Sequence, residues 1–210
     1  NFNIDFSQIT FAATDAHKLV RYTFRDLESN VATSLILTKK SMQILSSILP
    51  KNQTVTLYFN KTKAFFSFDQ TLLTTRLVEA KFPDYNAVIP VSNNNILTVS
   101  REELISALRR LSIFASKTTN QVVMSLNEGS LTINAQDLDF YNEATEQLSC
   151  SYEGDVLNVG VNAKNLIEML TLIDYETVVF QLSSENKPLV ILPQEQDNGE
   201  DLLMLLVTTS

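Results

Sequence analysis

Residues 97–114 read LTVSREELISALRRLSIF, a short apolar run followed by Ser100 and then by a segment of helical periodicity. Leu104 and Leu108 stand one helical turn apart, which is typical of the apolar stripe of an amphipathic helix. Ser100 is of a residue type that accepts hydrogen bonds from the free N–H groups of a first helical turn. Glu103, three residues later, would complete a capping box. This stretch predicts a strand, a cap at Ser100 and an amphipathic helix.

The same pattern occurs twice more, at residues 35–50, LILTKKSMQILSSILP, and at residues 159–174, VGVNAKNLIEMLTLID. The corresponding caps, Thr38 and Asn162, each lie 62 residues from Ser100. Each predicted helix is followed by two alternating strands around a polar turn, and then by a third strand. We interpret the repeat as a βαβββ unit. The alternative is that strand–helix–meander arrangements are common and that the equal spacing is a coincidence.

Three complete units and one partial unit account for the chain. Residues 1–33 resemble the end of a unit, because they lack the leading strand and helix. Pairing the units predicts two domains, residues 1–91 and 92–210, joined through the proline-containing stretch 82–95. Each domain is expected to be α+β, with two helices packed on an antiparallel sheet. The first domain is expected to be truncated at its N-terminus, and the start at Asn1 suggests a piece of a longer protein.

Composition restricts the classes of protein to which the chain can belong. With 210 residues, of which 44% are hydrophobic and 19% charged, the chain can bury a core and does not have a disordered composition. One Cys excludes a disulfide framework, and one His leaves few ways to build a histidine metal site. No apolar run approaches the roughly 20 residues of a membrane span. The first residues, NFNIDFSQIT, show no signal peptide.

The net charge of −8 is distributed unevenly. Residues 1–117 contain 14 Lys and Arg and 9 Asp and Glu, whereas residues 118–210 contain 2 and 15. Several basic residues fall on the predicted helices, and most of the acidic excess falls outside them. Such a distribution can direct a positive potential toward one face of an acidic protein.

Signatures of enzymes are absent from the sequence, which has no G-x-S-x-G, no glycine-rich phosphate loop and no H-E-x-x-H. Asp137, Asp139, Glu143 and Glu146 could form paired carboxylates or a hydrolase metal site. Their spacing is not that of an EF-hand, so a solvated acidic loop and strand is the favoured interpretation. Cys150 is expected to be a small apolar filler. We expect neither an enzyme nor a bound cofactor or metal.

Two motifs resemble the bacterial DNA polymerase sliding clamp family, the β-subunit processivity factors. Residues 13–20, ATDAHKLV, are similar to the family's T-D-G-H-R-L strand, with Ala16 in place of the usual Gly and Lys18 in place of the usual Arg. Residues 76–90, RLVEAKFPDYNAVIP, are similar to the segment that marks the exit from the family's middle domain. Together with the repeats, the resemblance covers the whole chain as the second and third domains of the DNA-clamp fold, without the first.

The resemblance implies a processivity factor that encircles duplex DNA and tethers the replicative polymerase, the clamp loader and repair polymerases. It implies a cytoplasmic protein at the bacterial nucleoid, with weak and non-specific phosphate contacts. The helices would line the hole of the ring. The cations expected to face DNA are Lys39, Lys40, Arg101, Arg109, Arg110, Lys117 and Lys164. The alternative is a peptide-binding scaffold that does not bind nucleic acid, since helices of many proteins carry Lys and Arg.

A cleft that binds short peptides of the Gln-x-x-Leu-Phe type is the second implication. An apolar pocket would take the hydrophobic anchors of the peptide. This chain ends in Leu206-Val207-Thr208-Thr209-Ser210 instead of the family's apolar-Pro-Met-apolar tail. The matching positions are Thr14, Ala16, His17, Lys18, Leu19, Pro83, Ala87, Val88, Asn162, Asn165, Leu206 and Val207.

Self-association is the third implication, since the family forms a homodimeric ring by joining third and first domains. The matching positions are Ile113 and Phe114, with the acidic strand around Glu143 and Glu146. The alternative for Phe114 is a place in the core. Without a first domain, the chain is expected to be largely monomeric at micromolar concentration.

Overall fold

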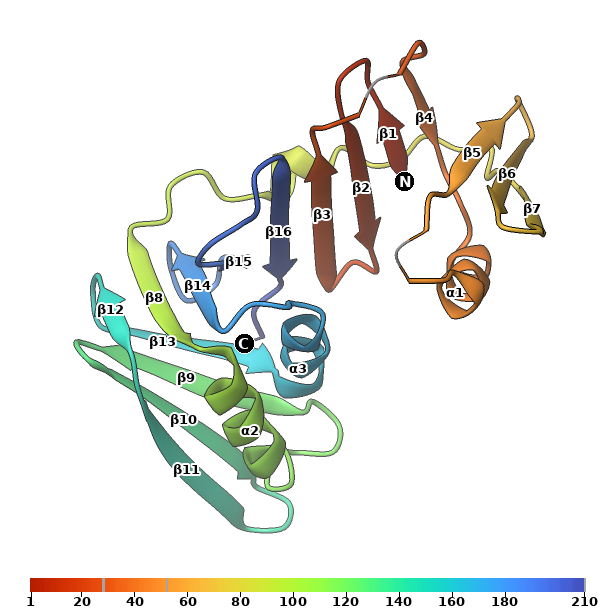
Figure 1. The fold of residues 1–210 in the computed structure, drawn as a ribbon. Helices are drawn as coiled ribbons and strands as arrows, with labels where there is room; N and C mark the ends of the chain where they lie inside the picture. The colour runs from red at the N-terminus through yellow and green to blue at the C-terminus, as the bar shows by residue number, and fades with distance from the viewer. Residues whose placement is uncertain (28, 52, 210) are drawn as a thin grey trace. The chain divides into compact units, whose positions relative to one another are not determined.

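The computed structural model describes residues 1–27, 29–51 and 53–209 as two compact units. Unit 1 comprises Asn1–Ala12 and Thr23–Asp84, and unit 2 comprises Ala13–Tyr22 and Tyr85–Ser210. Figure 1 labels β2 (Ile9–Thr14) and β3 (Lys18–Phe24), which form a hairpin. The tip of this hairpin belongs to unit 2. The domain boundary at residues 91 and 92 stays a prediction.

Unit 1 contains one complete repeat. Its strand β4 (Thr33–Leu35) leads into α1 (Lys39–Ile48), and a meander of three strands follows. In this meander β6 pairs on both sides, with β5 and with β7. Phe66 and Phe68 on β6 form a small core with Met42 and Leu45 of the helix. The strands are β5 (Thr56–Phe59), β6 (Lys63–Phe68) and β7 (Thr71–Arg76), and β1 (Phe2–Ile4) pairs with β2 and β4.

Unit 2 contains two complete repeats, each with its own helix. The first repeat consists of β8 (Asn95–Ser100), α2 (Arg101–Leu111), β9 (Gln121–Asn127), β10 (Ser130–Asp137), β11 (Asn142–Ser149) and β12 (Ser151–Glu153). The second consists of β13 (Leu157–Asn162), α3 (Ala163–Thr171), β14 (Thr177–Leu182), β15 (Leu189–Pro193) and β16 (Glu200–Leu206). A short 3-10 helix, η1 (Tyr85–Val88), precedes them.

The two repeats of unit 2 exchange their leading strands. β8 of the first repeat pairs with β14 of the second, and β13 of the second pairs with β9 of the first, both antiparallel. The strands therefore form two sheets, in the orders β11-β10-β9-β13 and β12-β8-β14-β15-β16-β3. The expected α+β architecture is confirmed, and each helix of unit 2 carries the chain from one of these antiparallel sheets to the other.

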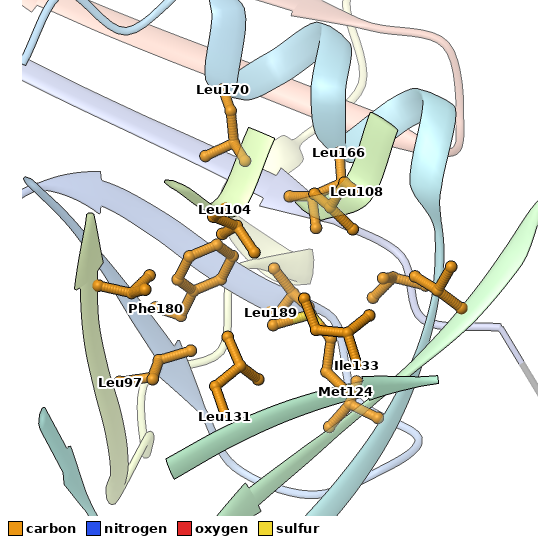
Figure 2. Packing of buried hydrophobic residues seen from close by; sticks show 14 of the residues in the cluster. Leu97, Leu104, Leu108, Met124, Leu131, Ile133, Leu166, Leu170, Phe180 and Leu189 are labelled. Atoms are coloured by element: carbon orange, nitrogen blue, oxygen red, sulfur yellow. The ribbon is translucent and has the colours of Figure 1, made fainter. Parts of the chain in front are cut away.

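One apolar core lies between the two sheets and the two helices of unit 2. Leu104 and Leu108 of α2 and Leu166 and Leu170 of α3 are fully buried, and α2 packs against α3. Figure 2 shows these side chains close to Leu97, Met124, Leu131, Ile133, Phe180 and Leu189 from the strands. Burying a Leu contributes roughly 1.5–3 kcal/mol, so this cluster accounts for much of the stability of unit 2.

All three predicted caps are confirmed. Thr38, Ser100 and Asn162 each precede a helix, and each side chain accepts a hydrogen bond from the backbone N–H three residues later. Among the described residues, Glu103 returns no hydrogen bond to the Ser100 N–H, so only half of the predicted capping box forms. No helix in the described part of the chain is long and apolar enough to cross a membrane.

Candidate functional site

The tip of the β2–β3 hairpin is closed by its own side chains. Thr14 Oγ1 donates to the Lys18 carbonyl at 2.8 Å, and Asp15 Oδ1 accepts from the N–H groups of His17 (3.0 Å) and Lys18 (2.8 Å). Partial burial opposes ionisation of Asp15, but the hydrogen bonds from Lys18 and His17 outweigh it and lower the pKa of this carboxyl group. The tip is therefore a defined turn that presents the side chain of His17 to solvent.

Ala16 adopts a backbone conformation that favours glycine, with φ at 73°. An L residue with a Cβ atom is strained in this region, whereas Gly is not. The motif that residues 13–20 resemble usually has Gly at this position, whereas this chain has Ala16.

Lys18 joins the hairpin tip to α3. Its Nζ lies 3.3 Å from Asp15 Oδ2, 3.2 Å from Asn165 Oδ1 and 2.6 Å from Glu168 Oε2. Only 18% of the side chain is exposed, and the hydrogen bond to Glu168 is the main reason that the pKa of Lys18 is raised. The amide of Asn165 also takes part in the helix cap, since its N–H donates to Asn162 Oδ1.

The C-terminal tail lies against the same region of unit 2. The N–H of Val207 donates to the His17 carbonyl at 3.0 Å, and the N–H of Thr209 donates to the Gly160 carbonyl at 2.8 Å. A Cβ atom at Gly160 would lie 2.4 Å from the carbonyl oxygen of Thr209, so only glycine allows this approach. The polar tail is thus fixed on β13 by backbone contacts.

The structure brings most of the predicted cleft residues into unit 2. Thr14, Ala16, His17 and Lys18 lie at the hairpin tip, Asn162 and Asn165 at the start of α3, and Val207 after β16. Leu19 is 2% exposed and Leu206 is fully buried, so neither offers an open apolar surface. Ala87 and Val88 are exposed on η1, and Pro83 is exposed in unit 1.

The cations predicted to face DNA differ in how they are engaged. Lys39, Lys40, Arg109, Lys117 and Lys164 are exposed, and Lys117 donates to the Ile113 carbonyl. Arg101 is 18% exposed, with Nε 2.7 Å from the Tyr175 carbonyl oxygen and Nη2 3.6 Å from Glu102. The Arg110 guanidinium is bonded to both carboxylate oxygens of Glu146, which raises the pKa of Arg110 and lowers that of Glu146. Arg101 and Arg110 are therefore less available for phosphate contacts than the other five.

The predicted self-association residues lie at the surface of unit 2. Ile113 is 66% exposed and Phe114 is exposed as well, so the alternative that Phe114 belongs to the core was wrong. Glu143 on β11 accepts from Asn134 Nδ2 at 2.9 Å, and Glu146 on the same strand holds Arg110. The exposed pair follows the end of α2 at Leu111.

The acidic loop forms part of a small cavity of about 390 Å³ in unit 2. Asp137 is 5% exposed, and its Oδ1 accepts from the N–H of Asp139 at 3.1 Å. Among the described residues, no three His, Cys, Asp or Glu side chains are grouped so that they could hold a metal ion. Cys150 packs against the core, where burial raises the pKa of its thiol. The cavity is lined by Ser116, Thr119, Gln121, Val123, Asn134, Gln136, Asp137, Leu138 and Asp139.

Two family models match the chain, one after the other. Residues 1–84 match the central domain of the DNA polymerase III beta subunit, and residues 86–206 match its C-terminal domain. The chain belongs to the DNA polymerase III beta subunit family. This confirms the family suggested by the two sequence motifs.

Relatives with curated names support the same assignment for this beta-subunit chain. It is 27% identical to the beta sliding clamp of Synechococcus elongatus over 194 residues, which cover 88% of the chain and 51% of that relative. It is 27% identical to the beta sliding clamp of Haemophilus influenzae over 205 residues, which cover 97% of the chain and 56% of that relative. The chain thus spans about half the length of the curated relatives that it matches.

Solved structures confirm the sliding clamp fold. A DNA polymerase sliding clamp from Pseudomonas aeruginosa superimposes with a TM-score of 0.93 at 24% identity, covering 100% of this chain and 57% of that chain. A sliding clamp from Bartonella birtlesii bound to griselimycin gives 0.89 at 25% identity, covering 100% and 57%. The beta-subunit fold therefore holds over the whole chain.

Sequence reasoning did not find Glu168, Gly160 or Thr209 as parts of this beta-subunit site. Glu168 looks like any exposed helical carboxylate, and its pairing with Lys18 depends on a contact between residues 150 positions apart. Gly160 gave one usable signal, because a glycine inside an alternating strand often marks the close approach of another backbone.

Proposed function

We propose that this chain is the central and C-terminal part of a DNA sliding clamp, a non-catalytic processivity factor. The complete protein would encircle duplex DNA and tether the replicative polymerase, the clamp loader and repair polymerases, in the cytoplasm at the nucleoid. One observation carries the proposal, namely that two consecutive clamp domain models match the chain in their natural order. No cofactor or metal takes part.

The cleft proposed for partner peptides is built around the hairpin tip, the start of α3 and the tail. His17 is exposed there, and its neighbours are held by hydrogen bonds within unit 2. A wall that is ordered before binding lowers the entropy cost of taking up a short peptide. Clamps of Pseudomonas aeruginosa and Bartonella birtlesii have been solved bound to griselimycin, so the fold accommodates a bound ligand in those proteins.

In each unit, the exposed cations of the helices are proposed to contact DNA. Lys39 and Lys40 begin α1, Arg109 lies in the last turn of α2 and Lys164 lies in the first turn of α3. A ring that stays on DNA by topology needs only weak, non-specific phosphate contacts, and a few solvated cations suffice for this. The complete protein is proposed to be a head-to-tail homodimer, with Ile113 and Phe114 in the subunit contact.

A second candidate function is a peptide-binding scaffold that does not contact nucleic acid. It is favoured by the engagement of two predicted DNA contacts, since Arg101 binds the Tyr175 carbonyl and Arg110 binds Glu146. Both candidate functions use the cleft. They differ in whether the exposed cations of the helices contact DNA.

The cleft is tested by calorimetric titration of this chain with a Gln-x-x-Leu-Phe peptide. We expect micromolar binding that weakens about tenfold in His17→Ala, as for a contact residue of moderate importance. Val156→Ala, on an exposed loop residue of unit 2, is the control and should bind like the unmodified chain. Leu19→Asp is unsuitable because a buried unpaired charge would unfold the region. A folded chain that does not bind the peptide would contradict the proposed cleft.

The proposed DNA contact is tested in the full-length protein by reversing two charges singly, Arg109→Glu and Lys164→Glu. A clamp should lose loading or retention on circular DNA, whereas a scaffold should be unaffected. Lys187→Glu reverses an exposed lysine in the β14–β15 loop, outside the helices, and is the charge-matched control for each of the two single variants. Equal DNA retention in all variants would favour the scaffold.

A further inference from the structure

Lys18 occupies a position at which a cation could meet a partner peptide, yet all of its bonding capacity is used within unit 2. A lysine ammonium has three N–H donors and accepts no hydrogen bond. Here three oxygen atoms surround it, from Asp15, Asn165 and Glu168, at 2.6 to 3.3 Å. Two of the three belong to carboxylates, so the positive charge is compensated before any partner arrives.

The three oxygen atoms come from two separate segments of the chain. Asp15 belongs to the hairpin tip itself, whereas Asn165 and Glu168 lie on successive turns of α3. The ammonium group therefore fastens the tip to the helix, at a site where only 18% of the lysine side chain remains exposed. Partial burial and several partners make such a network stronger than an isolated surface ion pair.

The neighbours of Lys18 are the residues that the proposed cleft uses. The carbonyl of His17 accepts from Val207 at the start of the tail, and the side chain of Leu19 is buried. A change in the distance between the tip and α3 would therefore displace His17 and Val207 together. Residues that contact a ligand keep their geometry only when neighbouring residues hold them in place.

We propose that Lys18 is a positioning residue of the cleft, which locks the hairpin tip onto α3 through Asn165 and Glu168, and that it does not itself bind the partner peptide. This inference rests on the proposed peptide-binding function. It assigns the same positioning role to Glu168, which lies in neither sequence motif.

The attachment of the hairpin tip to α3 by Lys18 is tested first in the free chain, by NMR-detected amide hydrogen exchange of residues 15–19. Lys18→Met should accelerate exchange at these amides by about fivefold, the effect of losing a modest ion-pair network. Lys18→Arg should keep the slow exchange, because a guanidinium group can bind the same oxygen atoms. Lys187→Met removes an exposed lysine from the β14–β15 loop and should change nothing at the tip. Unchanged exchange in Lys18→Met would overturn the inference, whether or not the chain binds peptides.

Peptide affinity then separates positioning from direct contact. If Lys18 positions the tip, Glu168→Gln should weaken peptide binding by up to about fivefold, and the double variant should bind no more weakly than Lys18→Met. If Lys18 contacts the peptide, Glu168→Gln should strengthen binding, because it frees the ammonium group. Stronger binding by Glu168→Gln would overturn the inference while leaving the proposed function intact. Absence of binding by the unmodified chain would contradict the proposed function, and the exchange experiment would still decide the role of Lys18.

Discussion

α1 of unit 1 and α3 of unit 2 begin in the same way and are buried differently. Each follows a short strand, and each is capped by a side chain that accepts from the N–H three residues later. Yet α1 has no buried residue, whereas α3 buries four and the neighbouring α2 buries five. Local sequence thus sets where the helices start, and the partner repeat determines how much of them is covered.

The exchange of leading strands explains this difference. In unit 2 each repeat supplies a strand to the meander of the other, so both helices share one core. In unit 1 the meander of the complete repeat has three strands, and among the described residues no strand pairs with the free edge of β5. A single repeat therefore leaves its helix without buried residues, and the apolar side of the helix is buried when a second repeat packs against it.

The largest expected effect comes from matched substitutions at the seventh residue after each cap. Met169→Ala removes a side chain that is 2% exposed and should cost about 2–5 kcal/mol of unfolding free energy. Leu45→Ala lies at the same place in α1, where the side chain is only partly buried, and should cost about half as much or less. Urea unfolding followed by a probe in each unit measures both. An equal loss of unfolding free energy in the two variants would contradict the difference in burial between α1 and α3.

Unit 2 is also closed by its tail, and Gly160→Ala should release it. The added Cβ would overlap the Thr209 carbonyl oxygen, and such overpacking typically costs about 1–3 kcal/mol. Faster amide exchange at Val207 and Thr209 is the expected signature, together with a lower urea midpoint. A variant with unchanged exchange at both amides would show that the tail does not depend on the absence of a side chain.

The caps should have similar effects in the two units because they act locally. Thr38→Ala and Asn162→Ala should each cost about 1 kcal/mol, with the loss confined to the first turn of the helix concerned. Local amide exchange at Ser41 and Asn165 reports this directly, since these N–H groups donate to the caps. A cost several times larger at Asn162 would mean that its second bond, to the Thr119 carbonyl, matters more than the cap.

Ala16→Gly should have the smallest effect and the opposite sign. Gly adopts the observed φ of 73° without strain, which is worth about 0.5–1 kcal/mol, although its flexibility in the unfolded chain offsets part of the gain. A small rise in the unfolding midpoint is the expected result. A drop would show that the methyl group of Ala16 makes a contact that outweighs the strain.

How much could be predicted from the sequence depended on the range of the interactions involved. The caps at Thr38, Ser100 and Asn162 follow from residues close in the chain, and all three are found. The exchange of β8 and β13 could not be predicted, because hydrophobic periodicity is the same whichever meander a strand joins. The burial of Leu19 was missed for a related reason, since an alternating strand does not show which of its faces is covered.

The same limit applied to the candidate site. Motif similarity located the hairpin tip at His17 and Lys18, but the ion pair between Lys18 and Glu168 depends on how α3 packs. Arg110 was likewise expected to be available for DNA. In the structure it forms a salt bridge with Glu146 on β11. Charges that look equivalent in a sequence differ once their partners are known.

Mapping a bound Gln-x-x-Leu-Phe peptide onto this chain by NMR chemical shifts tests the proposed clamp cleft most directly. The account predicts shifts concentrated at Ala16 and His17, at the first turn of α3 and at Val207, with Val156 and the β10–β11 turn unchanged. A peptide that binds with its largest shifts elsewhere in unit 2, or one that fails to bind the folded chain, would contradict it.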